Sequence, residues 1–501
     1  MVLKPGEWTV SKGPEVKLLE KAKFWTSFPL DIENKESEIR FRPAKESPLG
    51  IHFLRAFGGN NLSPWQAVVL DDLPLIARKD RNNNSLKNAL ELKNAAVLTG
   101  TIQEKRAEFY RLKLAKGESV TIEVLGQRLL TSLDPFLRLS DEQGRQLAFN
   151  DDEPGLGKDS RLRYTAKVEQ AIIIEVRDSY YQGSDKHTYV LRIGDFPRVN
   201  AAWETSVFGL DHAPLSIGKD IGMAQWFTAW TAEGKPAGFM TMAAKTGETQ
   251  SEAEPNDQQD RATLLNKLPI SVYGTFVKNG DTDWYSWEAK KGEKFLVRAQ
   301  TRSIGLPTDV RLSAHGADGK STGVSKVAAE DEGVLDMTAN ADGRMFLRVN
   351  HIAGMAGPEQ GYRLNIRAAK TGFDARMETN SLVVAAGGTA DLKLTVDRLG
   401  YDGEIQFNLQ PKVEGLSLAK SSVEAKKKGE VTFQVKAEES LSPGSVFQVR
   451  VQSVNPAAAG YVRSYSALTN QYGPSSTMAS VLDGWITVAI KAKQEEKGKT
   501  P

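Results

Sequence analysis

The chain has 501 residues, of which 40% are hydrophobic and 26% are charged, and its formal net charge is +2. A chain of this length holds roughly three to five domains of ordinary size, and a charge so close to neutral gives no reason to expect nucleic acid as a partner. Cysteine is absent, which excludes disulfides, thiolate metal ligands and a cysteine nucleophile. No apolar run approaches the roughly 18 residues of a membrane-spanning helix, so membrane insertion is not expected.

The N-terminal part of the chain, residues 1–73, contains short apolar-rich runs separated by turn-forming residues. The clearest runs are 38–41, 50–55 and 67–70. Runs of this length bounded by Gly, Pro and Asn are typical of strands, and we interpret the region as the last strands of an immunoglobulin-like segment, truncated at its N-terminus. The opening residues lack the apolar core of a signal peptide, so the chain is either intracellular or a piece of a longer exported protein.

The middle of the chain repeats itself over residues 74–197 and 251–370, named here the first repeat and the second repeat. Corresponding residues are 173 to 175 positions apart, so insertions are few. The matching landmarks are Gly100 and Gly274, Tyr110 and Tyr285, Gly117 and Gly292, and Tyr189 and Tyr362. A short helix is predicted near Ser85–Leu92 and another near Gln258–Leu265. Self-similarity of this kind indicates that the two repeats share one fold.

The clearest strand pattern lies in residues 371–490, where apolar and polar residues alternate. The alternation is strict in 392–396, 405–409, 431–435 and 447–451. A period of two is the pattern of half-buried antiparallel strands. It predicts a second immunoglobulin-like sandwich in this region.

Two stretches remain outside these regions. Residues 198–250 are rich in Gly, Ala and aromatic residues and predict a connector or a small β-unit, and the charged tail 491–501 is predicted to be disordered. Taken together, the patterns predict an all-β chain built from tandem β-sandwiches.

Three motifs follow one another within about 45 residues at the start of the second repeat. They are Glu252-Ala-Glu254-Pro-Asn256-Asp257, Gly280-Asp281-Thr-Asp283-Trp-Tyr285 and Lys291-Gly292. In this order they resemble the bacterial pre-peptidase C-terminal (PPC) domain, a jelly-roll-like β-sandwich that accompanies secreted peptidases. The first repeat matches the later part of the family pattern through Leu133-Asp134-Pro135, the loop Asn150–Asp152 and the strand that contains Tyr189.

The resemblance covers about half of the chain. Two PPC-like repeats with immunoglobulin-like flanks look like large exported proteins of planctomycete-type bacteria. The resemblance therefore implies an extracellular or cell-surface location and favours a piece of a longer protein.

The resemblance also implies a Ca²⁺ site in the second repeat, because the related collagen-binding domains of clostridial collagenases hold Ca²⁺ with the same two motifs. The implied ligands are Glu252, Glu254, Asn256, Asp257, Asp281 and Asp283. Their chemistry suits the ion, since Ca²⁺ takes six to eight oxygen ligands, and five carboxylates gathered without a cation would repel one another. The alternative is that residues 252–257 are only a solvated acidic linker.

The first repeat offers a comparison within the same chain. Its aligned residues are Arg78, Asp80, Asn82, Asn83, Arg106 and Glu108. A guanidinium group has no lone pair to offer a metal, so we predict that the first repeat binds no Ca²⁺ here and that its two arginines pair with Asp80 and Glu108. A second acidic loop, Asn150–Glu153 with Asp159, fits a metal site or a hairpin turn with solvated acids equally well.

One catalytic pattern occurs, in which Gly319, Ser321 and Gly323 match the G-x-S-x-G nucleophile motif. That motif needs a strand, a sharp turn and a helix, whereas the surrounding residues predict a turn between two strands. No histidine has the spacing of a zinc ligand pair. Trp284 and Tyr285 are neighbours on a predicted strand, so their side chains point to opposite faces and one of them is expected in the core.

The sequence therefore predicts a non-catalytic extracellular β-sandwich array that spaces, stabilises or tethers parts of an exported protein. Two alternatives stay open. One is an adhesion module for protein or polysaccharide, which a contiguous exposed aromatic patch on one sheet would favour. The other is the accessory region of a secreted peptidase whose catalytic domain is absent from this chain.

Overall fold

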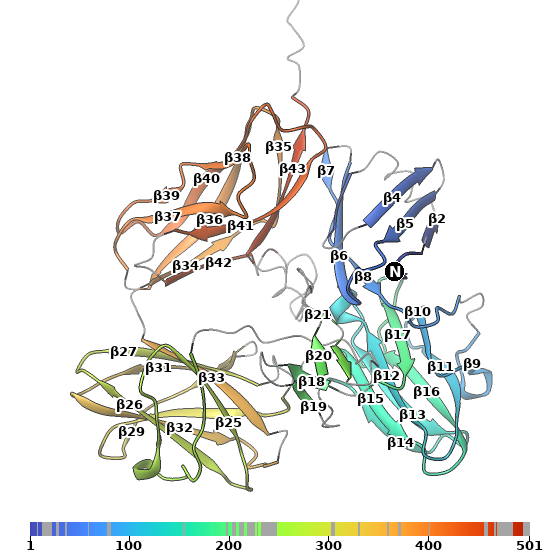
Figure 1. The fold of residues 1–501 in the computed structure, drawn as a ribbon, viewed down its shortest axis with the longest axis horizontal. Coiled ribbons are helices and arrows are strands. Elements are labelled where there is room, and N and C mark those ends of the chain that lie inside the picture. Colours follow the sequence, from blue (N-terminus) through green and yellow to red (C-terminus); the bar gives the residue numbers. More distant parts are fainter. Residues whose placement is uncertain are drawn as a thin grey trace, which may run out of the picture.

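The structure is a computed structural model, and it is all β in the part of the chain that it describes (Figure 1). This confirms the fold class predicted from the alternating pattern. The described residues are 1–7, 9–12, 23–26, 30–35, 38–58, 60–77, 82–153, 156–196, 199–202, 207–209, 215–217, 226–227, 229–231, 248–301, 306–328, 331–357, 360–368, 372–399, 401–454, 459–464, 467 and 484–493.

The N-terminal unit has two sheets. In the larger sheet β1, β8 and β6 lie side by side, and β3 and β7 also pair with β6; in the smaller sheet the order is β2-β5-β4. The strands are β1 (Val2–Leu3), β2 (Thr9–Lys12), β3 (Lys23–Thr26), β4 (Leu30–Lys35), β5 (Glu38–Pro43), β6 (Gly50–Gly58), β7 (Asn61–Leu62) and β8 (Gln66–Leu70).

The first repeat is a sandwich of two sheets, with orders β10-β17-β12-β15 and β14-β13-β16-β11-β9. Its strands are β9 (Leu90–Leu92), β10 (Ala96–Thr101), β11 (Ala107–Leu114), β12 (Ser119–Leu125), β13 (Pro135–Asp141), β14 (Gln146–Asn150), β15 (Ser160–Thr165), β16 (Gln170–Asp178) and β17 (Thr188–Gly194). Two 3₁₀ turns accompany them, η2 (Leu86–Asn88) and η3 (Gln127–Leu129).

The second repeat has the same order of matching strands and adds β23 and β30 at the two edges of one sheet, with sheets β23-β25-β33-β27-β31-β30 and β24-β26-β32-β28-β29. Its elements are β23 (Glu248–Ser251), η4 (Gln259–Arg261), β24 (Thr263–Leu264), β25 (Ile270–Thr275), β26 (Thr282–Ala289), β27 (Lys294–Gln300), β28 (Val310–His315), β29 (Ser321–Val324), β30 (Lys326–Ala328), β31 (Asp331–Thr338), β32 (Gly343–His351) and β33 (Gly361–Ala368). The predicted short helices are single 3₁₀ turns, η2 and η4, because the chain then enters the edge strands β9 and β24.

The C-terminal unit is also a two-sheet sandwich, with orders β38-β40-β36-β34-β42 and β35-β43-β41-β37-β39. Its strands are β34 (Gly372–Met377), β35 (Ser381–Ala385), β36 (Thr389–Leu399), β37 (Ile405–Gln410), β38 (Leu416–Ala419), β39 (Ser422–Val423), β40 (Gly429–Ala437), β41 (Val446–Ser453), β42 (Ala459–Arg463) and β43 (Trp485–Lys491). The residues that alternate in the sequence face the core of this sandwich, as a period of two requires.

The segment between the repeats contributes strands to more than one sheet. Its β21 (Trp226–Phe227) pairs with β6 of the N-terminal unit. Two further antiparallel pairs consist of β18 (Val199–Ala202) with β19 (Val207–Gly209), and β20 (Leu215–Ile217) with β22 (Ala229–Thr231). The choice between a connector and a small β-unit stays open, because most of residues 198–250 lie outside the described part of the chain.

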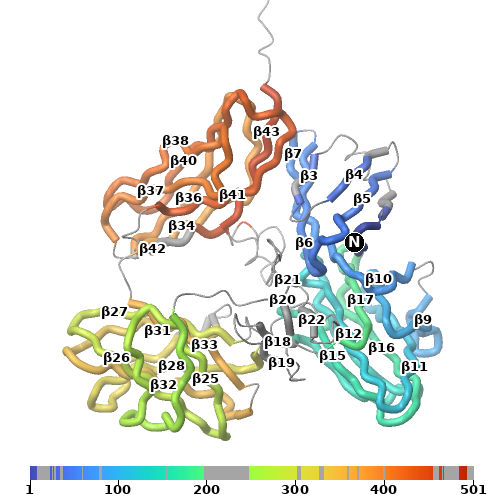
Figure 2. The backbone as a smooth tube through the Cα atoms, in the orientation of Figure 1, coloured from blue at the N-terminus to red at the C-terminus, as the bar shows by residue number. Residues whose placement is uncertain are grey.

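The N-terminal unit and the first repeat share a hydrophobic core. Ile51 and Val69 of the former belong to the same buried cluster as Val97 and Val190 of the latter. Figure 2 follows the N-terminal strands (blue) down to the first repeat (cyan and green) against which they lie. The two elements therefore pack as one body, although the sequence pattern separates them.

A buried network of charges joins the same two parts. Glu123 accepts hydrogen bonds from Arg128, Arg161 and Arg192, at 2.8, 2.7 and 2.7 Å. Arg192 also donates to Asp71 of the N-terminal unit at 2.6 Å. All five side chains are at most 1% exposed. The three guanidinium groups hold the pKa of Glu123 far below its usual range, even though burial opposes that shift.

The first and last units of the chain are also in contact. Arg55 of β6 is 2% exposed, and its Nη1 donates to Thr487 Oγ1 at 3.0 Å and to the Asn380 carbonyl at 3.3 Å. Figure 1 shows the C-terminal unit (orange) beside the N-terminal unit (blue). The chain therefore returns on itself across more than 300 residues.

Candidate functional site

The acidic segment of the second repeat lies along the start of β26. The Glu252 backbone N–H donates to the Tyr273 carbonyl at 2.9 Å, and the Trp284 N–H donates to the Asn256 carbonyl at 3.0 Å. These two bonds fix both ends of the segment beside β25 and β26. The residues of the first motif are thereby brought next to Asp283 of the second motif.

Three of the six predicted ligands converge. Glu252, Glu254 and Asp283 each offer a carboxylate oxygen, and the three oxygens lie within 4.8 Å of one another. Asp283 is fully buried, Glu252 is half-buried and Glu254 is exposed. The group thus reaches from the sandwich core to the surface, where an ion could enter.

Two buried oxygens at this place have no hydrogen-bond partner among the described residues. They are Asn256 Oδ1 and Asp283 Oδ1, and both side chains are fully buried. Asn256 Nδ2 donates to Thr263 Oγ1 at 3.3 Å, which orients the amide. Buried oxygens without a partner are costly, and a bound cation would satisfy both. The donor set of carboxylate and amide oxygens is the chemistry that Ca²⁺ prefers.

Two buried tyrosines form the floor of the group. Tyr285 Oη donates to Glu252 Oε2 at 3.2 Å and lies 2.8 Å from Tyr362 Oη, and Tyr362 Oη donates to Asp283 Oδ2. The Tyr362 ring passes directly over Gly274, where an added Cβ would lie 2.3 Å from Tyr362 Oη. Tyr285 is the core member of the Trp284–Tyr285 pair, as the alternation predicted.

Two carboxyl groups of this cluster, those of Asp283 and Glu252, have raised pKa values and hold their protons more tightly than usual. Burial raises the pKa of Asp283 to about 8, and the nearby Glu252 carboxylate adds to the shift. Burial also raises the pKa of Glu252 to about 7, with Glu254 adding to it and the N–H of Thr275 opposing it. Like charges close together in a low-dielectric place cannot all ionise unless a cation joins them.

The other two predicted ligands have different partners. Asp281 Oδ2 accepts a hydrogen bond from the Val277 N–H at 2.6 Å, so this carboxylate closes the turn before β26. Asp257 Oδ1 forms an ion pair with Lys278 at 2.6 Å. Both residues belong to the sequence motifs, but the motifs could not show that residues of the turn between β25 and β26 bind their carboxylates.

The first repeat keeps the tyrosine pair and changes its surroundings. Glu108 Oε2 accepts hydrogen bonds from Tyr110 at 2.8 Å and from Tyr189. The Phe109 N–H donates to the Asn83 carbonyl at 2.7 Å, as Trp284 does to Asn256. Asn83 is therefore the counterpart of Asn256, and the predicted alignment, which paired Asn256 with Asn82, was wrong by one residue.

With this register, the positions that match Glu252 and Glu254 are Lys79 and Arg81 rather than Arg78 and Asp80. All four residues lie outside the described part of the chain, so the predicted pairing of Arg78 with an acid stays a prediction. Arg106, which was expected to pair with a carboxylate, is exposed.

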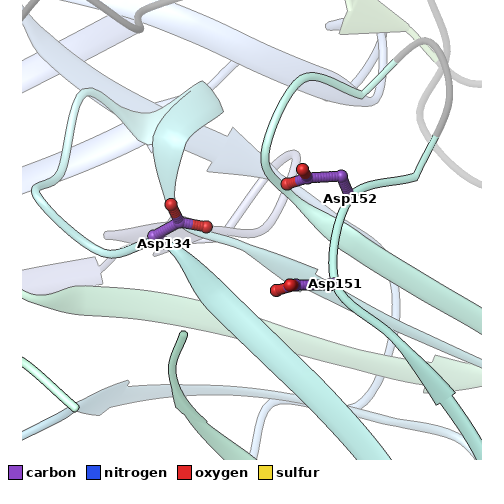
Figure 3. Close-up of side chains that lie close together, drawn as sticks. All are labelled: Asp134, Asp151 and Asp152. Carbon is purple, nitrogen blue, oxygen red and sulfur yellow. The ribbon is translucent and has the colours of Figure 1, made fainter. Parts of the chain in front are cut away.

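A second group of carboxylates lies in the first repeat (Figure 3). Asp134, Asp151 and Asp152 bring carboxylate oxygens within 4.8 Å of one another. Lys158 Nζ forms an ion pair with Asp134, so the lysine ammonium group already supplies a positive charge to this cluster. Asp159 is separate from it, because its buried carboxylate accepts the Arg128 Nε at 2.6 Å. The metal site predicted from the loop sequence did not include Asp134, because this residue directly precedes the neighbouring strand β13 and lies far from the loop in the sequence.

The G-x-S-x-G motif lies in a hairpin. Gly319 is in the turn between β28 and β29, with φ of 77°, and Ser321 is exposed at the start of β29. A strand follows the serine where a nucleophile elbow requires a helix, which confirms the predicted turn. Within the described residues, no helix has the length and apolar character needed to cross a membrane.

Comparison with known proteins gives no family for this chain. No family model matches it, and no curated protein matches it. Among solved structures, the lysozyme inhibitor PliG of Aeromonas hydrophila is 12% identical, with a TM-score of 0.18, over 24% of this chain and 97% of its own.

Two larger structures are similarly distant. A part of ZmpB from Clostridium perfringens, containing its M60 catalytic domain and two CBM51 domains, is 8% identical with a TM-score of 0.15, and 70% of this chain covers 55% of it. The N-terminal four Ig domains of Dscam1 isoform 9.44 are 10% identical with a TM-score of 0.18 over 98% of this chain and 96% of their own. TM-scores this low support no statement about the fold or function of this chain.

Proposed function

We propose that the chain is a non-catalytic, extracellular β-sandwich array that spaces or tethers parts of an exported protein, and that its second repeat is a PPC-like domain clamped by Ca²⁺. The observation that carries the proposal is the convergence of Glu252, Glu254 and Asp283 beside two buried oxygens without partners. When bound, the ion would supply the positive charge that lets these carboxylates ionise together.

Four residues would hold the ion: Glu252, Glu254, Asn256 and Asp283. Three of them lie in the segment between β23 and β24, and Asp283 belongs to β26. A shared ion would therefore fasten this segment to the sandwich directly after β23, the first strand of the repeat, and stiffen that end of the domain. A spacer needs stiff domain ends, whereas no step of catalysis is required of them.

The test is a thermal melt of the whole chain in excess EDTA and in Ca²⁺, together with calorimetric titration of Ca²⁺. Extracellular Ca²⁺ modules bind with Kd of roughly 10⁻⁴–10⁻³ M, and a concentration about 100 times Kd adds about 2.7 kcal/mol of stability. One transition should then rise by about 10 °C. Equal melts in EDTA and in Ca²⁺ would rule out the calcium clamp and leave the spacer role to be tested separately.

A further inference from the structure

An aromatic face covers the outer side of one sheet in the first repeat, at the end of the strands β13, β14 and β16. Its exposed members are Phe149 (56%), Tyr180 (73%), Tyr181 (51%) and Leu147 (36%). Exposed large apolar side chains that gather on one surface mark an interaction site more often than single ones do. This is the kind of patch that would distinguish a binding module from a plain spacer.

The face is held together by a continuous stack of flat groups. The rings of Phe149 and Phe136 are nearly parallel, at 19°, with centroids 5.9 Å apart. The Arg177 guanidinium carbon lies 3.8 Å from the Phe136 centroid and 4.4 Å from the Tyr181 centroid. Phe136 and Arg177 are directly opposite on neighbouring strands, so the sheet itself fixes the order of the stack.

The turn that carries the tyrosines is rigid. Asp178 is 1% exposed, and its Oδ1 accepts hydrogen bonds from the N–H groups of Tyr180 and Gln182, both at 2.9 Å. Tyr181 has φ of 57°, a left-handed conformation that disfavours a bulky side chain. A strained residue held in place by its surroundings is a feature of functional sites.

The second repeat serves as the comparison. At the matching places it has Arg311, Val324 and Asn350 instead of Phe136, Phe149 and Arg177.

The turn differs in the same way. Gly354, with φ of 66°, occupies the place of Tyr181, and its N–H donates to the His351 carbonyl as the Tyr181 N–H donates to that of Asp178. The fold therefore needs no aromatic ring at any of these positions. The aromatic rings are therefore a feature of the first repeat and not of the shared fold, and a ligand of the first repeat alone would account for them.

Polar groups of both signs border the rings. Lys158 Nζ lies 5.9 Å from the Tyr180 centroid and also pairs with Asp134. Asp151 and Asp152 are exposed beside them. The three aspartates outnumber Lys158, so this border disfavours an anionic polymer, and its carboxylates can accept hydrogen bonds from a ligand with many hydroxyl groups.

We propose that the aromatic face of the first repeat binds a neutral oligosaccharide. The C–H faces of sugar rings would pack against Phe149 and Tyr181, and hydroxyl groups would pair with the Asp151 and Asp152 carboxylates. The exposed apolar area is on the order of 400 Å², since buried aromatic side chains cover about 150–250 Å² each. The rings offer a surface for C–H faces and the neighbouring carboxylates accept hydrogen bonds from hydroxyl groups, so the chemistry of the face fits an oligosaccharide.

The proposal goes beyond the spacer role and does not depend on Ca²⁺. It is tested on the whole chain in EDTA by calorimetric titration with cellohexaose, xylohexaose, mannohexaose and maltohexaose. Titration up to about 5 mM detects Kd values near 1 mM, a binding free energy of about −4 kcal/mol. At least one of the four should bind with one site per chain.

Variants then locate the site. Phe149→Ala and Tyr181→Gly should each weaken binding about tenfold or more, because aromatic anchors dominate binding energy. Val324→Ala changes the matching place of the second repeat and should leave binding unchanged. Glycine is natural at the place matching Tyr181, so Tyr181→Gly is expected to keep the fold and its melting temperature, which circular dichroism checks.

Three results would overturn the proposal. The first is no binding of any of the four hexasaccharides. The second is binding that neither variant weakens. The third is binding of unfolded casein that depends on Phe149 while the sugars do not bind, which would assign the face to a protein partner instead.

Discussion

The two repeats share one sandwich architecture and differ in the residues that their surfaces carry. Both have the same order of matching strands, and both bury a tyrosine pair against a carboxylate, with Tyr110 and Tyr189 in the first and Tyr285 and Tyr362 in the second. The second repeat gathers further acids around its pair, whereas the first has stacked aromatic rings on a sheet face. A core set by apolar alternation leaves its loops and outer faces free to acquire separate binding chemistry.

The repeats also differ in how they join the rest of the chain. The first repeat has its four-stranded sheet against the N-terminal unit, with Glu123 and three arginines buried between them. At the place of Glu123 the second repeat has Arg298, which is exposed on β27. The first repeat is therefore expected to depend on its neighbour for stability far more than the second.

The largest expected effect is that of Glu123→Gln, which leaves three buried guanidinium groups without their shared anion. Removing one partner from a buried ion network costs about 3–5 kcal/mol. Chemical denaturation should show this loss in the transition that contains the first repeat. Arg298→Gln at the matching exposed place should change stability by less than about 0.5 kcal/mol. A loss of similar size in the two variants would contradict the difference between the repeats.

The next effect separates the two asparagines. Asn256→Ala removes a predicted Ca²⁺ ligand. It should abolish most of the Ca²⁺-dependent gain in unfolding free energy, which is about 2.7 kcal/mol at 100 times Kd. Asn83→Ala changes the counterpart in the first repeat and should leave the Ca²⁺ response intact. Melts with and without Ca²⁺ measure both. If Asn83→Ala removed the response instead, the ion would belong to the first repeat.

The acidic cluster predicts an unusual pH dependence of folding stability when no Ca²⁺ is bound. Asp283 and Glu252 have folded pKa values of about 8 and about 7, well above the unfolded values of about 3.9 and 4.3. Between these limits the folded state holds protons that the unfolded state has released, so stability falls as the pH rises.

In EDTA the second repeat should lose at least about 2 kcal/mol between pH 5 and pH 8. Denaturation at several pH values measures this fall, and Ca²⁺ should reduce it because bound carboxylates are ionised. Asp283→Asn cannot ionise and should flatten the EDTA profile. A profile that stays equally steep in Asp283→Asn would show that other groups cause the fall.

The smallest effect concerns the turn before β11 and β26. Lys105 has φ of 58° where the second repeat has Gly280 with φ of 76°. Lys105→Gly should stabilise the first repeat by about 1 kcal/mol or less, and Gly280→Lys should destabilise the second by a similar amount. If the backbone conformation is the cause, thermal melts of the two variants should show shifts in melting temperature of opposite sign. Shifts of the same sign would show that side-chain contacts decide instead.

Much of the candidate site could be predicted from the sequence. The resemblance of two local motifs to the PPC domain implied Glu252, Glu254, Asn256 and Asp283 among six ligands, and the structure brings the carboxylates of Glu252, Glu254 and Asp283 together. The roles of the other two acids could not be predicted. Asp281 closes a turn through the Val277 N–H, and such a bond depends on how the chain folds back between two strands.

The sequence by itself determined the all-β fold, the two repeats and the turns between strands, because a period of two and turn-forming residues are local signals. Tertiary structure alone decided which side chains meet across strands. The stack of Phe149, Phe136, Arg177 and Tyr181 joins three separate stretches, and the Arg55 contact with Thr487 spans most of the chain. Such neighbours depend on strand register and on how the units pack, which no local pattern records.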